Sequence, residues 1–456
     1  MVFQLKAKKE RYNNYFLKFT MMKSYIKTII VLIVFSSSIN AQEQRGLTGD
    51  DNWLSLWTEF KPDALNYNDN TEILMGNITE DITLYKSHTY LLLGNVFVTN
   101  NAILSIEPGT VIKGDFESKA TLTIAKGSAI IAEGTLTDPI VFTSNQSVKK
   151  AGDWGGIIIL GDGVTNKQGE SFAASFYPKI ETSNFVHTNY GGESLKNNSG
   201  YLSYVRVEFA GGKTKKTNET NALLLAGVGP ETTINNVMIS YSAGNSFGII
   251  GGQVNLEKMV SYRAKNIDYN FDYGTKSNIN NSLALRSPYV TSGTSKCIRA
   301  ASFVGEDVDF SMEGTKVVAT NMTLLADADD LEYAIEAGLI RESIYVGENT
   351  NFKIESSVIS SFSKAVSLHE NIIFNDTNLS RIQVKNVLFN NFKGAVFSKY
   401  SHESSEYLEN WYANPEFSNK YSKTTHSLLF RGLNSTNNRD YRLRLNRNIV
   451  MNNVNK

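Results

Sequence analysis

The 456-residue sequence is poor in several residue types, and each shortage excludes a class of structure or site. The single cysteine, Cys297, rules out an internal disulfide and an all-cysteine metal site, so we interpret it as a buried structural thiol. The five histidines show neither His-x-x-x-His nor His-Glu-x-x-His spacing, which argues against a zinc hydrolase. Lysine plus arginine equals aspartate plus glutamate, at 45 each, so no excess of charge indicates nucleic-acid binding.

Proline is also rare, with 7 residues, whereas glycine, tyrosine and phenylalanine number 33, 22 and 24. This mixture is more typical of short strands joined by turns than of helix bundles. Because the chain has no disulfide to hold it together, it needs a large continuous core if it is exported.

An apolar run near the N-terminus indicates export. It lies in "MMKSYIKTIIVLIVFSSSINAQ" (21–42), where Lys23 and Lys27 precede an apolar stretch and Ile39-Asn40-Ala41 fits a cleavage site, as in secretory signal peptides. A membrane anchor or a buried strand are the alternatives, but the run is short for a membrane span. We therefore expect 1–41 to be an over-extended start plus a signal peptide. The mature chain is expected in the periplasm, the outer membrane or at the cell surface, without a transmembrane segment.

Short strands recur along the chain from about residue 71. Apolar and polar residues alternate with period two in "AILSIEPGTVI", and similar runs follow every 10–20 residues with no helical stretch between them. Such repetition is typical of a sandwich, a propeller or a solenoid. The solenoid is favoured because "SSVISSFSKAVS" (356–367) matches "NVLFNNFKGAVF" (386–397) at an offset of 30.

Several runs carry a family resemblance that covers about 53–275. They are "YLLLGNVFVTNNAILSIEPGTVIKGD", "LTIAKGSAIIAEGTLTDPIVFTSN", "GDWGGIIILGDG", "SGYLSYVRVEFAGG" and "LLLAGVG". In these runs the chain resembles the exported right-handed parallel β-helix proteins of Bacteroidota, within the pectate-lyase-like β-helix class. The resemblance implies an all-β fold, a right-handed parallel β-helix (solenoid) with a short N-terminal cap and loop insertions. We place the N-terminal linker or cap at 42–75 and the β-helix domain at 76–456.

The glycine-rich stretch "AGDWGGIIILGDG" (151–163) raises the question of nucleotide binding. A phosphate-binding loop needs a following Lys-Ser/Thr and a helix, whereas here a β run, 157–160, follows the glycines. We therefore interpret the stretch as one coil of a solenoid, in which the glycines allow tight turns.

Acidic and basic residues between 263 and 309 are the candidates for catalysis. The resemblance points to the polysaccharide lyases of this fold, which use aspartates to hold calcium and an arginine or lysine as the base. The candidates are Arg263, Asp268, Asp272, Arg286, Asp307 and Asp309. Alternation would place Asp268 and Asp272 on one outer strand face, and likewise Asp307 and Asp309. A solvated loop or an ion-paired ladder is the alternative. The chain has no dedicated calcium motif, so we assign no metal ligand and no cofactor, and calcium stays an open alternative.

Two irregular insertions, 171–194 and 399–417, are rich in aromatic residues, which can stack on sugar rings. The candidates for ligand binding are Tyr177, Tyr190, Tyr407, Trp411 and Tyr412. The alternative is that these rings pack the insertions onto the solenoid.

Two functions remain open from the sequence. The first is an exported cell-envelope protein with a non-catalytic binding or adhesin-like role, directed at a glycan or an outer-membrane partner. The second is a polysaccharide lyase or glycoside hydrolase that uses acidic and arginine residues on an outer face. Acidic side chains that converge from neighbouring coils would favour the enzyme, whereas scattered ones would favour scaffold or binding.

Overall fold

The computed structural model describes residues 44–169, 171–177, 180–194, 196–212, 220–303, 308–400, 405–433 and 438–444. The segment expected to be a signal peptide and the candidate Asp307 lie outside these residues. The chain divides into two units, Met1–Gln44 and Arg45–Lys456, and the second contains every described helix and strand.

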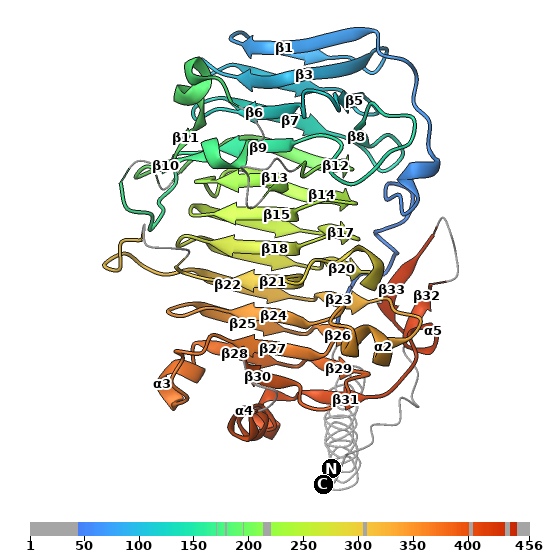
Figure 1. The fold of residues 1–456 in the computed structure, drawn as a ribbon, viewed down its shortest axis with the longest axis vertical. Coiled ribbons are helices and arrows are strands. Elements are labelled where there is room, and N and C mark those ends of the chain that lie inside the picture. Colours follow the sequence, from blue (N-terminus) through green and yellow to red (C-terminus); the bar gives the residue numbers. More distant parts are fainter. Residues whose placement is uncertain are drawn as a thin grey trace, which may run out of the picture. The chain divides into compact units, whose positions relative to one another are not determined.

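The unit is a right-handed parallel β-helix, which confirms the predicted fold class (Figure 1). Twenty-nine strands form one continuous parallel arrangement, and each complete coil contributes one strand to each of three lateral faces. Parallel neighbours need long connections, and here the connection between two strands of one face is the rest of a coil. Coils stack because one coil alone cannot bury its apolar side chains.

Face A carries the strands that start each coil: β6 (Thr121–Ile124), β9 (Gly156–Leu160), β13 (Asn221–Ala226), β15 (Asn245–Ile250), β18 (Ile267–Asp272), β21 (Lys296–Ala300), β24 (Glu342–Val346), β27 (Lys364–Leu368) and β30 (Phe397–Lys399). Face B follows along the chain: β2 (Ile82–Leu84), β4 (Ile103–Ile106), β7 (Ala129–Glu133), β16 (Gln253–Glu257), β19 (Lys276–Asn280), β22 (Lys316–Thr320), β25 (Asn351–Glu355) and β28 (Ile382–Lys385).

Face C closes each coil: β5 (Val111–Gly114), β8 (Ile140–Ser144), β17 (Val260–Tyr262), β20 (Leu283–Arg286), β23 (Thr323–Ala326), β26 (Val358–Ser360), β29 (Leu388–Asn390) and β31 (Lys420–Ser422). Longer strands bend across two faces: β1 (Glu72–Ile78) and β3 (Thr89–Val98) join C to A, and β12 (Gly200–Glu208) and β14 (Thr233–Ser240) join B to C.

Smaller elements lie in the connections: η1 (Pro62–Ala64), β10 (Ser171–Phe172), η2 (Ala173–Phe176), η3 (Thr182–Thr188), β11 (Asn189–Tyr190), η4 (Pro288–Val290), α2 (Leu331–Glu336), α3 (Asp376–Leu379), α4 (Glu406–Tyr412), η5 (Pro415–Phe417), α5 (His426–Leu429), β32 (Phe430–Gly432) and β33 (Asp440–Leu443). None of the described helices is long and apolar enough to cross a membrane.

The interior is built from the alternation seen in the sequence. On β16, Val254 and Leu256 are buried while the residues between and beside them are exposed. Aromatic side chains that point inward stack between neighbouring coils. Phe247, for example, stacks on Tyr269 with ring centroids 5.2 Å apart. The buried Cys297 lies in this core, as expected.

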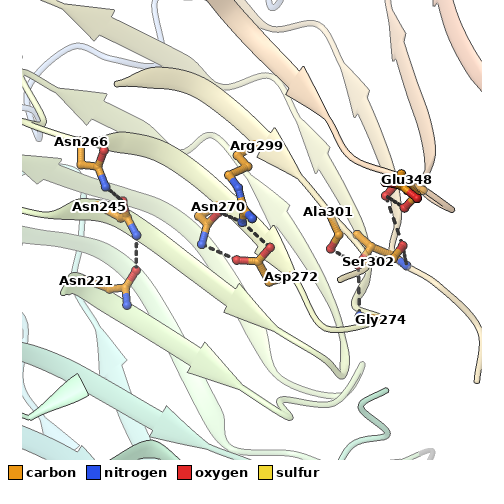
Figure 2. Close-up of polar contacts among 12 residues, drawn as sticks. Asn221, Asn245, Asn266, Asn270, Asp272, Gly274, Arg299, Ala301, Ser302 and Glu348 are labelled. Carbon is orange, nitrogen blue, oxygen red and sulfur yellow. Dashed lines mark hydrogen bonds and ion pairs between the residues drawn. The ribbon is translucent and has the colours of Figure 1, made fainter. Parts of the chain in front are cut away.

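The predicted offset of 30 residues between two coils is confirmed. Strand β26 pairs with β29 in the register Val358 to Leu388 and Ser360 to Asn390. The side chains continue the pairing, because Nδ2 of Asn390 donates to Oγ of Ser360 at 2.9 Å. A second ladder of stacked amides runs through Asn221, Asn245 and Asn266 at the start of face A (Figure 2).

Residues 45–69, which we call the N-terminal strap, lie along the outside of face C, whereas the sequence suggested a short cap or linker. The backbone N–H of Gly46 donates to the carbonyl of Ser356, and Trp57 packs edge-on against Tyr204 with centroids 5.8 Å apart. The strap therefore crosses many coils, and its apolar side chains bury the apolar outer side of face C. Irregular spacing of those side chains hid this from the sequence.

The C-terminal end of the stack is covered by α4. Tyr412 is fully buried, stacks on Phe397 at 4.4 Å, and donates its hydroxyl to the carbonyl of Ile382 at 2.8 Å. This explains why an aromatic insertion occurs there: it protects the last coil's apolar interior from water.

Candidate functional site

Asp268 and Arg286 form an ion pair inside the protein, so they are not available to a ligand. Nη1 of Arg286 lies 2.8 Å from Oδ2 of Asp268, and neither residue has more than 3% exposed surface. The guanidinium also donates to the backbone carbonyls of Lys296 and Ala264. Burial raises the pKa of Asp268, and Arg286 opposes that rise. The expected outward pair of Asp268 and Asp272 therefore does not form, because β18 starts at a buried corner of the coil.

Asp272 lies at the other end of β18 in a polar cluster on face A (Figure 2). Its carboxylate pairs with Arg299 and accepts a hydrogen bond of 2.7 Å from Nδ2 of Asn270. Nη1 of Arg299 also donates to Oδ1 of Asn270 at 3.1 Å. The three side chains satisfy one another, which is the behaviour of an ion-paired ladder.

The remaining charged candidates lie elsewhere. Arg263 occupies the corner between faces C and A with φ of 55°, and its guanidinium lies over the ring of Tyr262. Asp309 is half-buried between β21 and β22, where its carboxylate accepts hydrogen bonds from Ser311. The described acidic candidates thus do not converge. In the described ranges, no three His, Cys, Asp or Glu side chains are placed to share a metal ion.

Two aromatic candidates hold an insertion onto the solenoid. Tyr177 and Tyr190 are each 3% exposed, and the segment that contains them covers apolar residues on the outside of face A. The hydroxyl of Tyr177 forms a 2.7 Å hydrogen bond with that of Thr123. The structure thus supports the packing alternative for these two residues.

Tyr407 and Trp411 are more exposed than the buried Tyr412. Tyr407 is 47% exposed and stacks on Phe374 at 5.9 Å. Trp411 is half-buried beside Phe417. Of the five aromatic candidates, Tyr407 alone presents a largely open ring.

A groove of about 800 Å³ lies on face B, across β22, β25 and β28. Its floor is formed by outward residues of adjacent coils, in the register Lys316 to Asn351 and Lys353 to Gln383. Phe303 and Phe310, both between β21 and β22, form a wall, and their rings are 4.7 Å apart. The other lining residues are Met312, Glu313, Gly314, Val317, Val318, Asn349, Phe352, Ser380 and Arg381.

The charge of the groove is mainly positive. Lys316, Lys353 and Arg381 line it, against one described lining carboxylate, Glu313. Glu313 is ion-paired with Lys276, which lowers its pKa, and Lys353 pairs with Glu355. Lys316 and Arg381 make no ion pair with any residue that the structure describes. The groove can therefore hold an anionic group without breaking an internal pair of these two cations.

These groove residues were not identified from the sequence, although part of the signal was present. "KVVAT" and "NFKIE" alternate, so the lysines could be placed on the outer side of their strands. Which lysines become neighbours depends on the length of each coil. Lys276 and Lys316 are register partners across a coil that contains the extra loop of the wall, and no regular period predicts that pairing.

A serine–histidine contact near the C-terminal end is structural. Nε2 of His426 lies 2.9 Å from Oγ of both Ser360 and Ser361, but these serines are 0% and 2% exposed. A nucleophile must reach its substrate, so the contact serves to join α5 to the side-chain ladder of face C.

The chain matches the family described as "Pectate-lyase like beta helix domain" over residues 76–427, and it belongs to this family. No curated protein matches the chain. Among solved structures, the chain is similar to an alginate lyase from Paenibacillus sp. str. FPU-7, with 9% sequence identity and a TM-score of 0.27. That similarity covers 67% of this chain and 90% of the lyase.

Proposed function

We propose that the protein is an exported cell-envelope β-helix protein that binds an acidic polysaccharide, without cleaving it, in the groove on face B. The observation that carries the proposal is the combination of two cations that make no ion pair with a described residue, Lys316 and Arg381, with an aromatic wall in one groove of about 800 Å³. A groove of this size is in the range of ligand sites.

The lining suits a sugar chain in three respects. The cations can pair with carboxylate groups, and Asn351, Gln383 and Ser380 offer hydrogen-bonding groups for hydroxyls. The exposed ring of Phe310 offers an apolar surface for the face of a sugar ring. Because the floor crosses successive coils, a polymer can contact cationic and amide side chains of several coils at once.

Binding is favoured over glycoside hydrolysis because of how the carboxyl groups are distributed. Glycosidases use two carboxyl groups about 5–10 Å apart, one of them a general acid. The described groove lining holds one, Glu313, and that group is already paired with a lysine. The other described acidic candidates lie in the core, on face A or between β21 and β22.

Reversing the groove charge is expected to weaken binding. For the double variant Lys316→Glu, Arg381→Glu, we expect at least about a tenfold loss of affinity for oligogalacturonate, because two attractive contacts become repulsive. Affinity should also fall as salt is added. Isothermal titration calorimetry measures both effects. The matched control is Lys86→Glu, Lys265→Glu, which changes the net charge equally at exposed positions outside the groove lining.

Two results would count against this function. One is unchanged affinity in the groove variant alongside normal binding by wild type. The other is release of unsaturated uronate products, followed by their ultraviolet absorbance, when the protein is incubated with polygalacturonate or alginate and calcium. Such release would support the lyase.

Export is proposed from the signal-like segment 21–42. We expect the protein recovered from its native envelope to begin near Gln42, since signal peptides are removed in the mature protein. Mass spectrometry of the intact protein tests this, and an intact segment 21–41 in the envelope fraction would contradict it.

A further inference from the structure

Glu208 is a buried carboxyl group beneath the N-terminal strap. It ends strand β12 on face C and is 1% exposed. Neither of its carboxyl oxygens makes a hydrogen bond of good geometry to a described residue, although the hydroxyl of Thr143 is near enough to oppose the rise of its pKa. A buried carboxylate without hydrogen bonds is unfavourable, because it loses water and gains nothing equivalent. The position therefore favours the protonated, neutral form.

Among the described residues Arg206 is the cation that forms an ion pair with this carboxyl group, and its guanidinium is directed partly elsewhere. Nε of Arg206 lies 3.4 Å from Oε1 of Glu208, which is too far for a good hydrogen bond. Nη2 of the same guanidinium donates to the hydroxyl of Tyr67 in the strap, at 2.8 Å. Arg206 thus connects face C to the strap instead of neutralising Glu208 fully.

The other groups that face Glu208 come from three elements. Thr143 lies on β8, Lys149 on the β8–β9 connection, and Glu59 on the strap itself. Lys149 is also tied to the strap, because its Nζ donates to the carbonyl of Leu65 at 2.8 Å. A negative charge on Glu208 would repel Glu59 and draw Arg206 and Lys149 away from their strap contacts.

We propose that Glu208 is a proton-operated latch for the N-terminal strap: the strap lies closed on face C while Glu208 is protonated, and residues 59–69 lift away when it ionises. Lifting gives the carboxylate access to water. It also breaks the Arg206–Tyr67 and Lys149–Leu65 contacts and uncovers the side of face C around Met238, which the backbone of Glu59 now contacts.

The direction of the pH effect follows from the burial. Burial raises the pKa of Glu208 to about 7, with Arg206 opposing the rise, against 4.5 for the exposed group. The closed form therefore holds the proton more tightly than the open form. The stabilisation of the closed form relative to the open form is fully present below pH 4.5 and is lost as the pH rises through about 7. A difference of 2.5 pKa units, from 4.5 to 7, corresponds to a change of about 300-fold in the closed-to-open ratio.

Hydrogen exchange of the full chain tests the latch. We expect the protection of those backbone amides of 59–69 that donate hydrogen bonds in the closed form, such as that of Glu59, to fall by up to about 300-fold between pH 4.5 and pH 8.5, after correction for intrinsic exchange, while strands of the core stay protected. In Glu208→Gln, whose amide is neutral at every pH, the protection is expected to be independent of pH. The matched control is Asp63→Asn, an exposed carboxyl on the same segment, which should behave like wild type.

A second variant keeps the test decisive if Glu208→Gln does not fold. Tyr67→Phe frees the guanidinium of Arg206 to pair with the carboxylate, so the pH-dependent loss of protection should shrink well below that of wild type. The latch is overturned by pH-independent protection in wild type, or by the full wild-type pH dependence in Glu208→Gln or Tyr67→Phe.

Discussion

Asp268→Ala is expected to destabilise the protein by about 3–5 kcal/mol, because it leaves the buried guanidinium of Arg286 without its counter-ion. Asp268→Asn keeps the shape of the side chain but also leaves the charge uncompensated, so it should be only partly better. The double variant Asp268→Asn, Arg286→Met removes the unpaired charge and should recover part of the loss. Urea unfolding measures these differences as shifts of the midpoint concentration, provided that the dependence of the unfolding free energy on urea is unchanged.

The matched control for this pair is Asp309→Ala, which removes an exposed carboxyl group of the same type. We expect no measurable change in its unfolding midpoint. If Asp268→Ala unfolds at the wild-type midpoint, then the buried pair does not stabilise the coil. If the variant keeps its stability but loses a polysaccharide-cleaving activity that wild type shows, Asp268 has the catalytic role considered from the sequence.

The sequence was sufficient for the fold because the fold depends on local patterns. Alternation marked inward residues such as Leu104 and Ile106, and the offset of 30 placed Ser360 beside Asn390, as the structure has them. Both signals come from neighbouring residues or from coils of equal length, so no knowledge of long-range register was needed.

The sites depend on features that alternation does not contain. Asp268 has the parity of the outward positions on β18 but lies at a corner, where the adjoining strand buries it. Tyr177 and Tyr190 are covered by their own insertion. The groove requires the register of three coils with different connections, and the latch requires the strap to lie on face C. Each is a tertiary relation between distant segments.

The glycine-rich stretch "AGDWGG" is expected to be among the most sensitive parts of the scaffold because of Trp154. The indole is fully buried, stacks near Phe142 and donates to the carbonyl of Glu208 at 2.8 Å. We expect Trp154→Ala to cost about 3–5 kcal/mol through the cavity it leaves. Trp154→Phe should cost less, about 1–3 kcal/mol, since it mainly leaves that carbonyl unsatisfied. The half-buried Trp411 is the matched control, and Trp411→Ala should cost less than Trp154→Ala.

A double-mutant cycle with Gly114 separates packing from a general effect of losing a tryptophan. A methyl group at Gly114 would lie 2.6 Å from the indole ring, so Gly114→Ala should destabilise wild type by about 1–3 kcal/mol. In the Trp154→Ala background the contact with the indole ring is gone, but Cβ of residue 154 still lies 2.7 Å from the added methyl group, so the cost of Gly114→Ala should fall without vanishing. Urea unfolding of the four proteins gives the coupling energy. If the destabilisations of the two single variants simply add, the two residues do not pack against each other, and the absence of a side chain at Gly114 would need another explanation.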